Sequence, residues 1–245
     1  MKKTTSLLCT SVLLSLNVIA QETTTETNRY KYNNNFDLAL ASNGAQSAVA
    51  ISWVHNHAVT KNKKFTIGYG VRFTSQIGEN LTYTTAPAKL TSGTQGPQAM
   101  FTETIVKNID TLYVASSQNN MLNANINLQY AFTPKFEIGF NIDAVGFTFG
   151  ANTNGNYKAQ DNYPSSTQSA KPTTFNALLV SDNDLGSLNS ELYARYWLSN
   201  KIALRAGASF MFTEYTTANK LRLDNNRFRN KSLMPMLAIS FTPFK

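Results

Sequence analysis

The chain has few of the residues on which disulfide-bonded proteins and many enzymes depend. It contains one cysteine, Cys9, two histidines and only 15% charged residues among 245 positions. A single cysteine excludes an intrachain disulfide. No GxSxG, HExxH or phosphate-binding glycine motif occurs in the sequence. These absences argue against thiol chemistry and against the common hydrolase and nucleotide-binding sites.

Long hydrophobic runs are also missing. The longest apolar stretch, Leu7–Ala20, follows Lys2 and Lys3 and is too short for a membrane-spanning helix. A basic start, a short apolar run and a small residue before Gln21 are typical of a cleaved signal peptide. We therefore predict a signal peptide at 1–20 and a polar, disordered segment at 21–35, with the folded domain at 36–245.

The net charge of +8 is moderate, and loss of Lys2 and Lys3 would lower it by two. A basic balance fits nucleic acid or anionic lipid. Because an exported chain does not meet nucleic acid, we expect none as a partner. Without an apolar helix, such a chain could cross a membrane only as a closed barrel, in which every strand backbone group is paired.

A repeated unit is the strongest pattern present. Two alternating polar and apolar segments flank a short turn in 48–74, 122–150 and 188–215. Each unit predicts a hairpin of two long strands. With one further segment at Phe36–Ala41 and another at Lys231–Phe244, the total is eight strands.

The stretches between these units are long and polar, at 75–120, 151–187 and 216–230. Short turns that alternate with long loops are typical of outer-membrane barrels, in which the long loops face outside. The sequence therefore predicts an all-β fold, a single eight-stranded antiparallel transmembrane barrel at 36–245 with long extracellular loops. A soluble β-sandwich would also alternate, but strands of ten or more residues fit a tilted membrane strand better.

The mature chain resembles the small eight-stranded outer-membrane barrels, the group that includes OmpX and the membrane domain of OmpA. The Ala20–Gln21 junction, the Asn- and Thr-rich loops and the hairpin FTPKFEIGFNIDAVGFTFG at 132–150 are most similar to outer-membrane β-barrel families of Bacteroidota. The resemblance implies a location in the outer membrane of a Gram-negative cell. It also implies insertion by the barrel-assembly machinery, which reads a terminal aromatic.

Two aromatic residues compete for that role at the C-terminus. Phe241 continues the alternation, whereas Phe244 would need a bulge at Pro243. Pro235 likewise predicts a bulge or the end of strand pairing.

Seven charged residues fall on the face predicted to line the barrel lumen, namely Asp37, Arg72, Glu137, Asp143, Glu191, Arg195 and Arg205. An eight-stranded interior is only wide enough for side chains to fill it. Because unpaired buried charges are costly, we expect a network of ion pairs that closes the lumen. A path for protons or ions is the alternative.

Other candidate sites are weaker. His55 and His57 share a strand end, but a metal site needs further ligands, so we predict no metal, no cofactor and no catalytic residue. Asp182–Asp184 lacks the pattern of a calcium loop. The last loop is basic, and its candidates for contact with lipid head groups are Lys220, Arg222, Arg227, Arg229 and Lys231.

These patterns predict a non-enzymatic outer-membrane barrel whose outer loops serve surface interaction, adhesion or envelope support. The partners would be outer-membrane lipid and an unidentified extracellular or envelope component. An apolar hairpin, Phe101–Val106 with Ile109–Ala115, is expected in the first outer loop. The alternatives are a small-solute channel and, less favoured, an enzyme that processes lipid or peptide.

Overall fold

The computed structural model describes residues 34–160, 163–180 and 183–243. The predicted signal peptide at 1–20 lies outside the described residues, as does most of the segment at 21–35. The last two residues of that segment, Asn34 and Asn35, are ordered as the start of the first strand, where they pair with His55 and Val54. The barrel therefore begins two residues earlier than predicted.

The all-β fold predicted from the sequence is confirmed. One antiparallel sheet contains eleven strands, which are β1 (Asn34–Ser42), β2 (Gln46–Ala58), β3 (Phe65–Thr85), β4 (Thr111–Ala131), β5 (Phe136–Phe149), β6 (Thr153–Lys158), β7 (Ser166–Pro172), β8 (Phe175–Ala177), β9 (Leu188–Trp197), β10 (Ile202–Thr217) and β11 (Arg227–Phe241). Helical structure is limited to α2 (Ala88–Thr91) and the 3-10 turns η2 (Pro97–Phe101), η3 (Val106–Asn108) and η5 (Arg222–Asp224) in the part of the chain that the structure describes. None of the described helices has the length and apolarity needed to cross a membrane.

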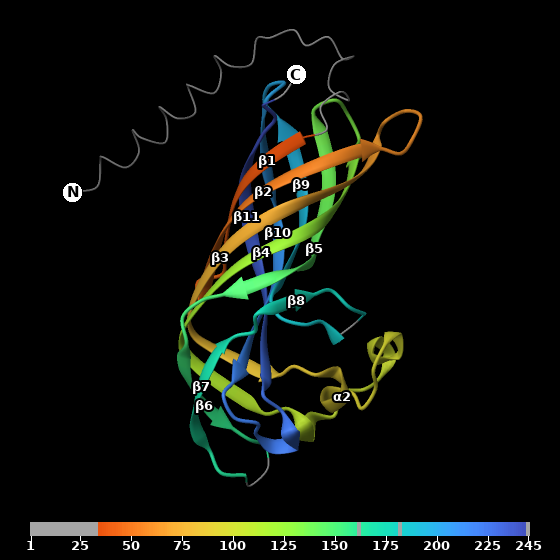
Figure 1. Ribbon diagram of the computed structural model, residues 1–245. Helices are drawn as coiled ribbons and strands as arrows, with labels where there is room; N and C mark the ends of the chain where they lie inside the picture. Colours follow the sequence, from red (N-terminus) through yellow and green to blue (C-terminus); the bar gives the residue numbers. More distant parts are fainter. Residues whose placement is uncertain (1–33, 161–162, 181–182, 244–245) are drawn as a thin grey trace, which may run out of the picture.

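Eight of the eleven strands close a ring. Pairing runs in the order β1, β2, β3, β4, β5, β9, β10 and β11, and β11 returns to β1 through pairs such as Phe36 with Phe241. Three short turns and the start of β1 lie at one end, which we call the turn end, and the opposite end holds the longer connections together with the short turn 43–45 between β1 and β2 (Figure 1). This ring is the barrel that the hairpin repeats predict.

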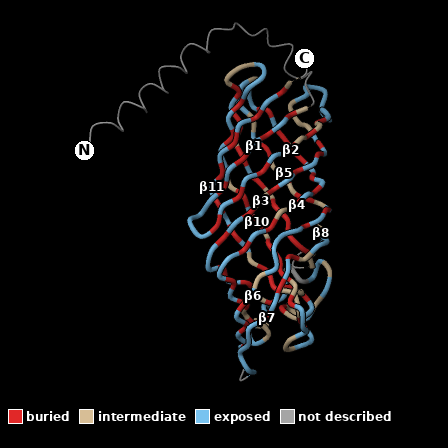
Figure 2. The backbone as a smooth tube through the Cα atoms, turned by 60° about the vertical axis from the view of Figure 1, so that its left-hand side comes forward, coloured by how far each residue is buried: buried red, intermediate tan, exposed pale blue. Residues whose placement is uncertain are grey.

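Side chains alternate between the two faces of the ring, as the sequence indicates. Large apolar residues point outward and remain exposed, and buried and exposed residues alternate accordingly along the strands (Figure 2). The outward set, which we call the apolar belt, includes Leu38, Leu40, Ile51, Val71, Phe73, Leu122, Ile126, Ile138, Leu192, Leu204, Phe210, Leu233, Leu237 and Ile239. Leu237 is 68% exposed, so water is a poor solvent for this surface and a lipid phase is a suitable one.

The prediction of long loops at the other end is wrong about their length, because strands occupy much of them. β3 and β4 are each 21 residues long and occupy most of 75–120, while β10 and β11 reach into 216–230. The stretch 151–187 holds β6, β7 and β8. The expected hairpin is also absent within this described segment, because Phe101 ends η2, Val106 begins η3 and only Thr111 onward is strand. The extended strands stand beyond the apolar belt as a separate folded unit.

This unit is a second, narrower ring, which we call the cap. Its six strands are the ends of β3, β4, β10 and β11 together with β6 and β7, and their pairing closes through Arg229 and Thr84. Apolar side chains fill it, namely Leu81, Tyr83, Leu112, Val114, Tyr157, Ala159, Ala170, Tyr215 and Phe228. The chain therefore carries two stacked cores rather than one barrel with loose loops (Figure 1).

The two rings meet at a break in the alternation. Glu79 and Asn80 are both exposed on β3, as are Ala115 and Ser116 on β4, and Asn80 has a φ of 52°. The inward face changes from even to odd numbers in β3 across this point. A one-residue shift moves every following side chain to the other face, which starts the new interior.

At the C-terminal strand, Pro235 pairs in register with Ala208, whereas pairing with β1 stops at Met236. The end of pairing on one side, rather than a bulge, accommodates Pro235. Phe241 is the last residue of β11, and Phe244 lies outside the described residues.

Candidate functional site: the filled lumen, its mouth and the cap

The structure brings all seven lumen charges predicted from the sequence together inside the ring. They come from five strands: Asp37 from β1, Arg72 from β3, Glu137 and Asp143 from β5, Glu191 and Arg195 from β9 and Arg205 from β10. Six of these side chains are at most 3% exposed, and Glu137 is 16% exposed. Strand alternation alone places them there, since each occupies an inward position of its strand.

Acidic and basic groups alternate along this cluster as a continuous chain. Arg72 bridges Asp143 at 2.6 Å and Glu191 at 3.0 Å. Arg205 bridges Glu191 and Asp37, both at 2.8 Å. Arg195 continues the chain from Asp37 to Glu137, both at 3.4 Å. Each arginine therefore lies between two carboxylates, and this geometry offsets the cost of desolvating the charges.

Neutral groups complete the hydrogen bonding of the chain. Arg72 also donates to the side chain of Asn141 at 2.7 Å and to the carbonyl of Asn189 at 2.5 Å. Asp143 accepts from Asn123 at 2.8 Å and from the amide of Asn189 at 3.0 Å. The three supporting asparagines come from three strands, Asn123 from β4, Asn141 from β5 and Asn189 from β9.

Tyr193 lies across the lumen beside the arginines. The Arg205 guanidinium is 3.7 Å from the centre of the Tyr193 ring, and the Tyr193 hydroxyl donates to Asn127 at 3.0 Å. Room for the ring comes from Gly139, where an added Cβ would lie 2.3 Å from Tyr193. Tyr193 lies on the same inward face of β9 as Glu191 and Arg195, but its contact with Gly139 depends on a pairing that only the fold supplies.

Methionines fill another part of the lumen, a feature that the sequence analysis missed. Met121, Met211, Met234 and Met236 are at most 2% exposed and form one cluster with Tyr193 and inward alanines of β1 and β2. Flexible thioether side chains fill irregular gaps well. The position of these four methionines on inward faces of the predicted strands is the sequence feature that could have indicated the cluster.

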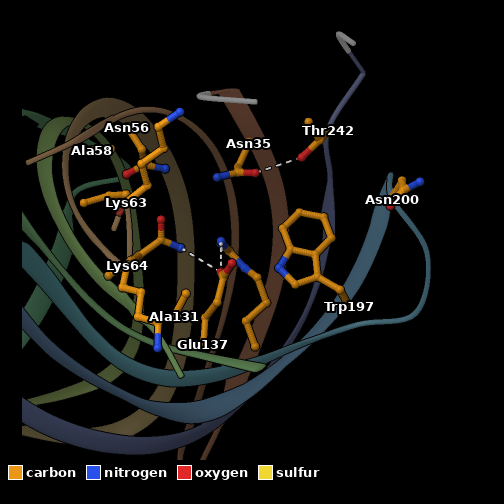
Figure 3. A pocket seen from close by; sticks show the side chains of 13 residues that line it. Asn35, Asn56, Ala58, Lys63, Lys64, Ala131, Glu137, Trp197, Asn200 and Thr242 are labelled. Carbon is orange, nitrogen blue, oxygen red and sulfur yellow. Dashed lines mark hydrogen bonds and ion pairs between the residues drawn. The ribbon is translucent and has the colours of Figure 1, made fainter. Parts of the chain in front are cut away.

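A small cavity of about 60 Å³ lies at the mouth of the lumen at the turn end (Figure 3). Glu137 and Trp197 line it, together with Lys64 from the first turn. Trp197 is 8% exposed and stacks near Arg195, with 5.7 Å between the guanidinium and the ring centre, so it points inward. Asn35 and Thr242 face each other across the mouth with a hydrogen bond of 2.8 Å (Figure 3).

Three arginines expected to meet lipid head groups are instead bound to buried carboxylates of the cap. Arg222 contacts Asp110 at 2.8 Å, while Arg227 and Arg229 each contact Glu214 at 2.8 Å. Asp110 and Glu214 are at most 2% exposed. These arginines are structural partners of buried acids, and their contact with lipid head groups stays a prediction.

The remaining two cations of that set are at the surface. Lys220 pairs with the exposed Asp224 at 2.7 Å, and Lys231 lies 5.7 Å from the ring centre of Phe212. An exposed ion pair such as the first contributes little to stability. Only Lys231 lies next to the apolar belt.

Asp110 organises the far end of the cap. It accepts hydrogen bonds from the hydroxyl of Tyr157 at 2.8 Å and from the amide of Gln160 at 3.0 Å, in addition to Arg222. Burial, together with the neighbouring Asp110 carboxylate, raises the pKa of Tyr157 well above its usual range. Burial also raises the pKa of Tyr83, whose hydroxyl contacts Thr213 at 3.1 Å. Both phenols are therefore neutral hydrogen-bonding groups of the cap core.

The weaker candidates stay weak. His55 and His57 have ring centres 4.5 Å apart near the turn end, and Nδ1 of His55 is 2.9 Å from the side-chain oxygen of Asn34. Among the described residues no group of three or more His, Cys, Asp or Glu side chains could hold a metal ion. In the segment Asp182–Asp184, Asp182 is outside the described residues, and Asp184 accepts from the amide of Leu179 at 2.7 Å.

Comparison with known proteins gives no family. Neither a protein-family model nor a curated protein matches the sequence. Among solved structures, Neisserial surface protein A aligns with 85% of this chain and 94% of its own, at 8% identity and a TM-score of 0.34. The monoaromatic hydrocarbon channel CymD aligns with 90% and 92% at 10% identity and 0.26, and the Ralstonia pickettii toluene transporter TbuX with 80% and 68% at 12% identity and 0.21. Similarity at this level assigns no activity, so function has to be argued from the chain itself.

Proposed function

We propose that this chain is a non-enzymatic β-barrel of the outer membrane of a Gram-negative cell, and that its cap is an extracellular module for surface interaction, adhesion or envelope support. The observation that carries the proposal is the apolar belt around a filled lumen, with a separately folded unit on one end only. The sequence resemblance to small outer-membrane barrels, and to Bacteroidota families in particular, agrees with it. The belt is the lipid-facing surface, and the turn end faces the periplasm.

Orientation follows from the connections. The turns at 59–64, 132–135 and 198–201 are short, and β1 begins at the same end. The long connections all lie at the cap end, and in barrels of this kind the long connections face outside, so the cap faces outside. Insertion would use β11 as the strand read by the assembly machinery, with Phe241 as its last aromatic residue.

The filled lumen favours an anchor over a small-solute channel. The ion-pair chain and the four methionines occupy the interior that a solute would have to cross. In planar bilayers we expect no steady open current from the purified barrel, whereas sustained single-channel steps would favour the channel. A variant with Arg72, Met121 and Met211 shortened to alanine is the matched control for an artificially widened lumen.

An enzymatic role has less support. Both histidines lie on β2 near the turn end, away from the cap, and neither contacts a nucleophile in the described hydrogen bonds. We therefore propose that the specific partner is an extracellular or envelope component that binds the cap, not a substrate.

Recovery of partners from outer membranes tests the proposal. The intact barrel is compared with a variant in which residues 86–110 are replaced by a short turn, after both have been shown to migrate as folded barrels in unheated gels. We expect the intact protein to retain components that the variant loses. Recovery of the same components by both proteins would remove the cap segment from the function.

A further inference from the structure

Positive charge gathers at the turn end of the barrel. The three short turns there hold five lysines, Lys61, Lys63, Lys64, Lys135 and Lys201, and no Asp or Glu. None of these lysines forms an ion pair with a residue that the structure describes. We call the five residues the lysine crown. Because charges of one sign add to the local potential, the crown should attract a ligand of the opposite sign.

Exposed acids are found toward the opposite end. Among the residues that the structure describes they are Glu79, Glu103 and Asp224, which lie at the break between the two rings or on the cap side of it. Glu137 at the turn end is only 16% exposed and is bound to Arg195 inside the mouth of the lumen. Within the described chain, the lysines of the crown therefore have no exposed acid near them.

The crown is spread around the ring. Its turns join β2 to β3, β4 to β5 and β9 to β10, so they follow one another at intervals of two strands. Lys63 and Lys64 line the cavity at the mouth of the lumen (Figure 3). Lys61, Lys135 and Lys201, one from each turn, are exposed and do not line it. These three side chains can therefore reach whatever surrounds the ring.

The edge of the apolar belt lies directly beside the crown. Lys135 precedes Phe136, which is 36% exposed, and Lys201 precedes Ile202, which is 42% exposed. One strand residue spans about 3.4 Å, so both lysines begin at the border of the apolar surface. Lysine side chains in such a place lay their apolar stem on the surface and put the ammonium group in the polar layer beyond it.

We propose that the lysine crown binds the head groups of acidic phospholipids in the leaflet at the turn end. The crown supplies unpaired cations, and its place at the border of the belt favours a lipid over a soluble polyanion. Each lysine beside an anionic lipid surface should raise the affinity about five-fold. The leaflet as the setting of this contact rests on the proposed membrane location, whereas the binding of acidic lipid can be measured without a membrane.

Lipid binding in detergent tests the crown. Full-length protein in dodecyl maltoside is titrated with phosphatidylglycerol or phosphatidylcholine, and the bound lipids are counted by native mass spectrometry. We expect the wild type to prefer phosphatidylglycerol. In the triple variant Lys61→Gln, Lys135→Gln and Lys201→Gln this preference should fall at least five-fold, and high salt should weaken it in the wild type.

A second triple variant is the matched control. It replaces three exposed lysines toward the cap end, Lys89→Gln, Lys107→Gln and Lys158→Gln, and so has the same net charge with an intact crown. We expect it to keep the preference of the wild type. A wild type without this preference, or an equal loss in the two triple variants, would overturn the proposal. Binding of inorganic polyphosphate without a preference for phosphatidylglycerol would assign the crown to a soluble polyanion and would overturn it as well.

Insertion into phosphatidylcholine vesicles tests the membrane location separately. These vesicles have no net charge, and neither triple variant changes the apolar belt, so all three proteins should insert equally. Failure of all three to insert would contradict the proposed location alone. Normal insertion by a wild type that does not prefer phosphatidylglycerol would contradict the lysine crown alone.

Discussion

At the scale of single residues, the lumen shows how buried charges are tolerated inside a filled β-barrel. Arg72 contacts two carboxylates, Asp143 and Glu191. Glu191 is also paired with Arg205, whereas Asp143 has Arg72 as its one cationic partner among the ion pairs of the described residues. Arg72 lies next to one end of the ion-pair chain, so its removal leaves the terminal acid, Asp143, without an arginine partner. The stability of the barrel should therefore depend on Arg72 more than on any exposed cation.

Substitution of Arg72 by methionine should lower the free energy of unfolding by about 3–5 kcal/mol, because it leaves a buried charge uncompensated. Urea unfolding in lipid vesicles, followed by the fluorescence of Trp53 and Trp197, measures this. Lys61→Gln, in the exposed first turn, is the control and should change little. A loss below about 1 kcal/mol for Arg72→Met would mean that the two acids are protonated or hydrated when the arginine is gone.

The lumen residues could be predicted because alternation is a local property of each strand. The ion pairs of Arg222, Arg227 and Arg229 with buried acids could not be predicted in this way. Their acidic partners are Asp110, which is 112 positions from Arg222, and Glu214 on the neighbouring strand. A cluster of cations is interpreted as solvent-exposed when its acidic partners are distant in the sequence and the burial of those acids is not known.

At the scale of elements, the main error of the sequence-based prediction is the position of the strand ends, and its cause is physical. In the sequence, a strand of the wider ring is recognised by apolar residues at alternate positions, which form its outward face. Beyond the belt the outward face of β3 and β4 is polar, and the inward face changes phase at Asn80, so the pattern of 75–85 and 111–120 reads as a loop. The core of the cap is visible only after Tyr83, Leu112 and the other inward residues have been aligned across six strands.

The cap core predicts a local effect of mutation. Tyr83 is fully buried, and its ring contacts Tyr215 edge-on with 5.2 Å between centres. Tyr83→Ala should destabilise the cap by about 3–5 kcal/mol and expose 86–110 to protease, while the membrane ring still migrates as a folded barrel. Tyr113→Ala, on the outward face of β4 and 46% exposed, should leave the protease pattern unchanged. Simultaneous unfolding of both rings in Tyr83→Ala would show that they are one cooperative unit.

Alkaline pH should act on the same element. Burial raises the pKa of Tyr83 and of Tyr157, so both phenols stay neutral in the folded cap when those of an unfolded chain begin to ionise, at about pH 10. The folded state then binds more protons than the unfolded state, and stability falls as pH rises above that value. Limited proteolysis across this range should show the cap opening, and Tyr83→Phe should move the opening to higher pH. An unchanged midpoint in Tyr83→Phe would assign the effect to another group.

At the scale of the whole molecule, two rings of different chemistry share four strands. The wider ring has an apolar outside and a charged, filled inside, and the narrower ring has a polar outside and an apolar inside. The proposed location, with lipid around the first ring and water around the second, requires this inversion. One sheet satisfies both because β3, β4, β10 and β11 run through both rings.

The inversion predicts that an arginine introduced on the outward face is costly in the wider ring and nearly neutral in the narrower one. Leu237→Arg in the belt should lower the stability of the barrel in vesicles by about 2–4 kcal/mol, since a charge placed toward the bilayer interior costs that much. Tyr113→Arg, also outward but on the cap, should be within about 0.5 kcal/mol of the wild type, as surface substitutions usually are. Unfolding of both variants in the same vesicles measures the difference. Equal effects of the two substitutions would mean that the apolar belt does not face lipid, and would place the boundary between the two solvents elsewhere than at Asn80.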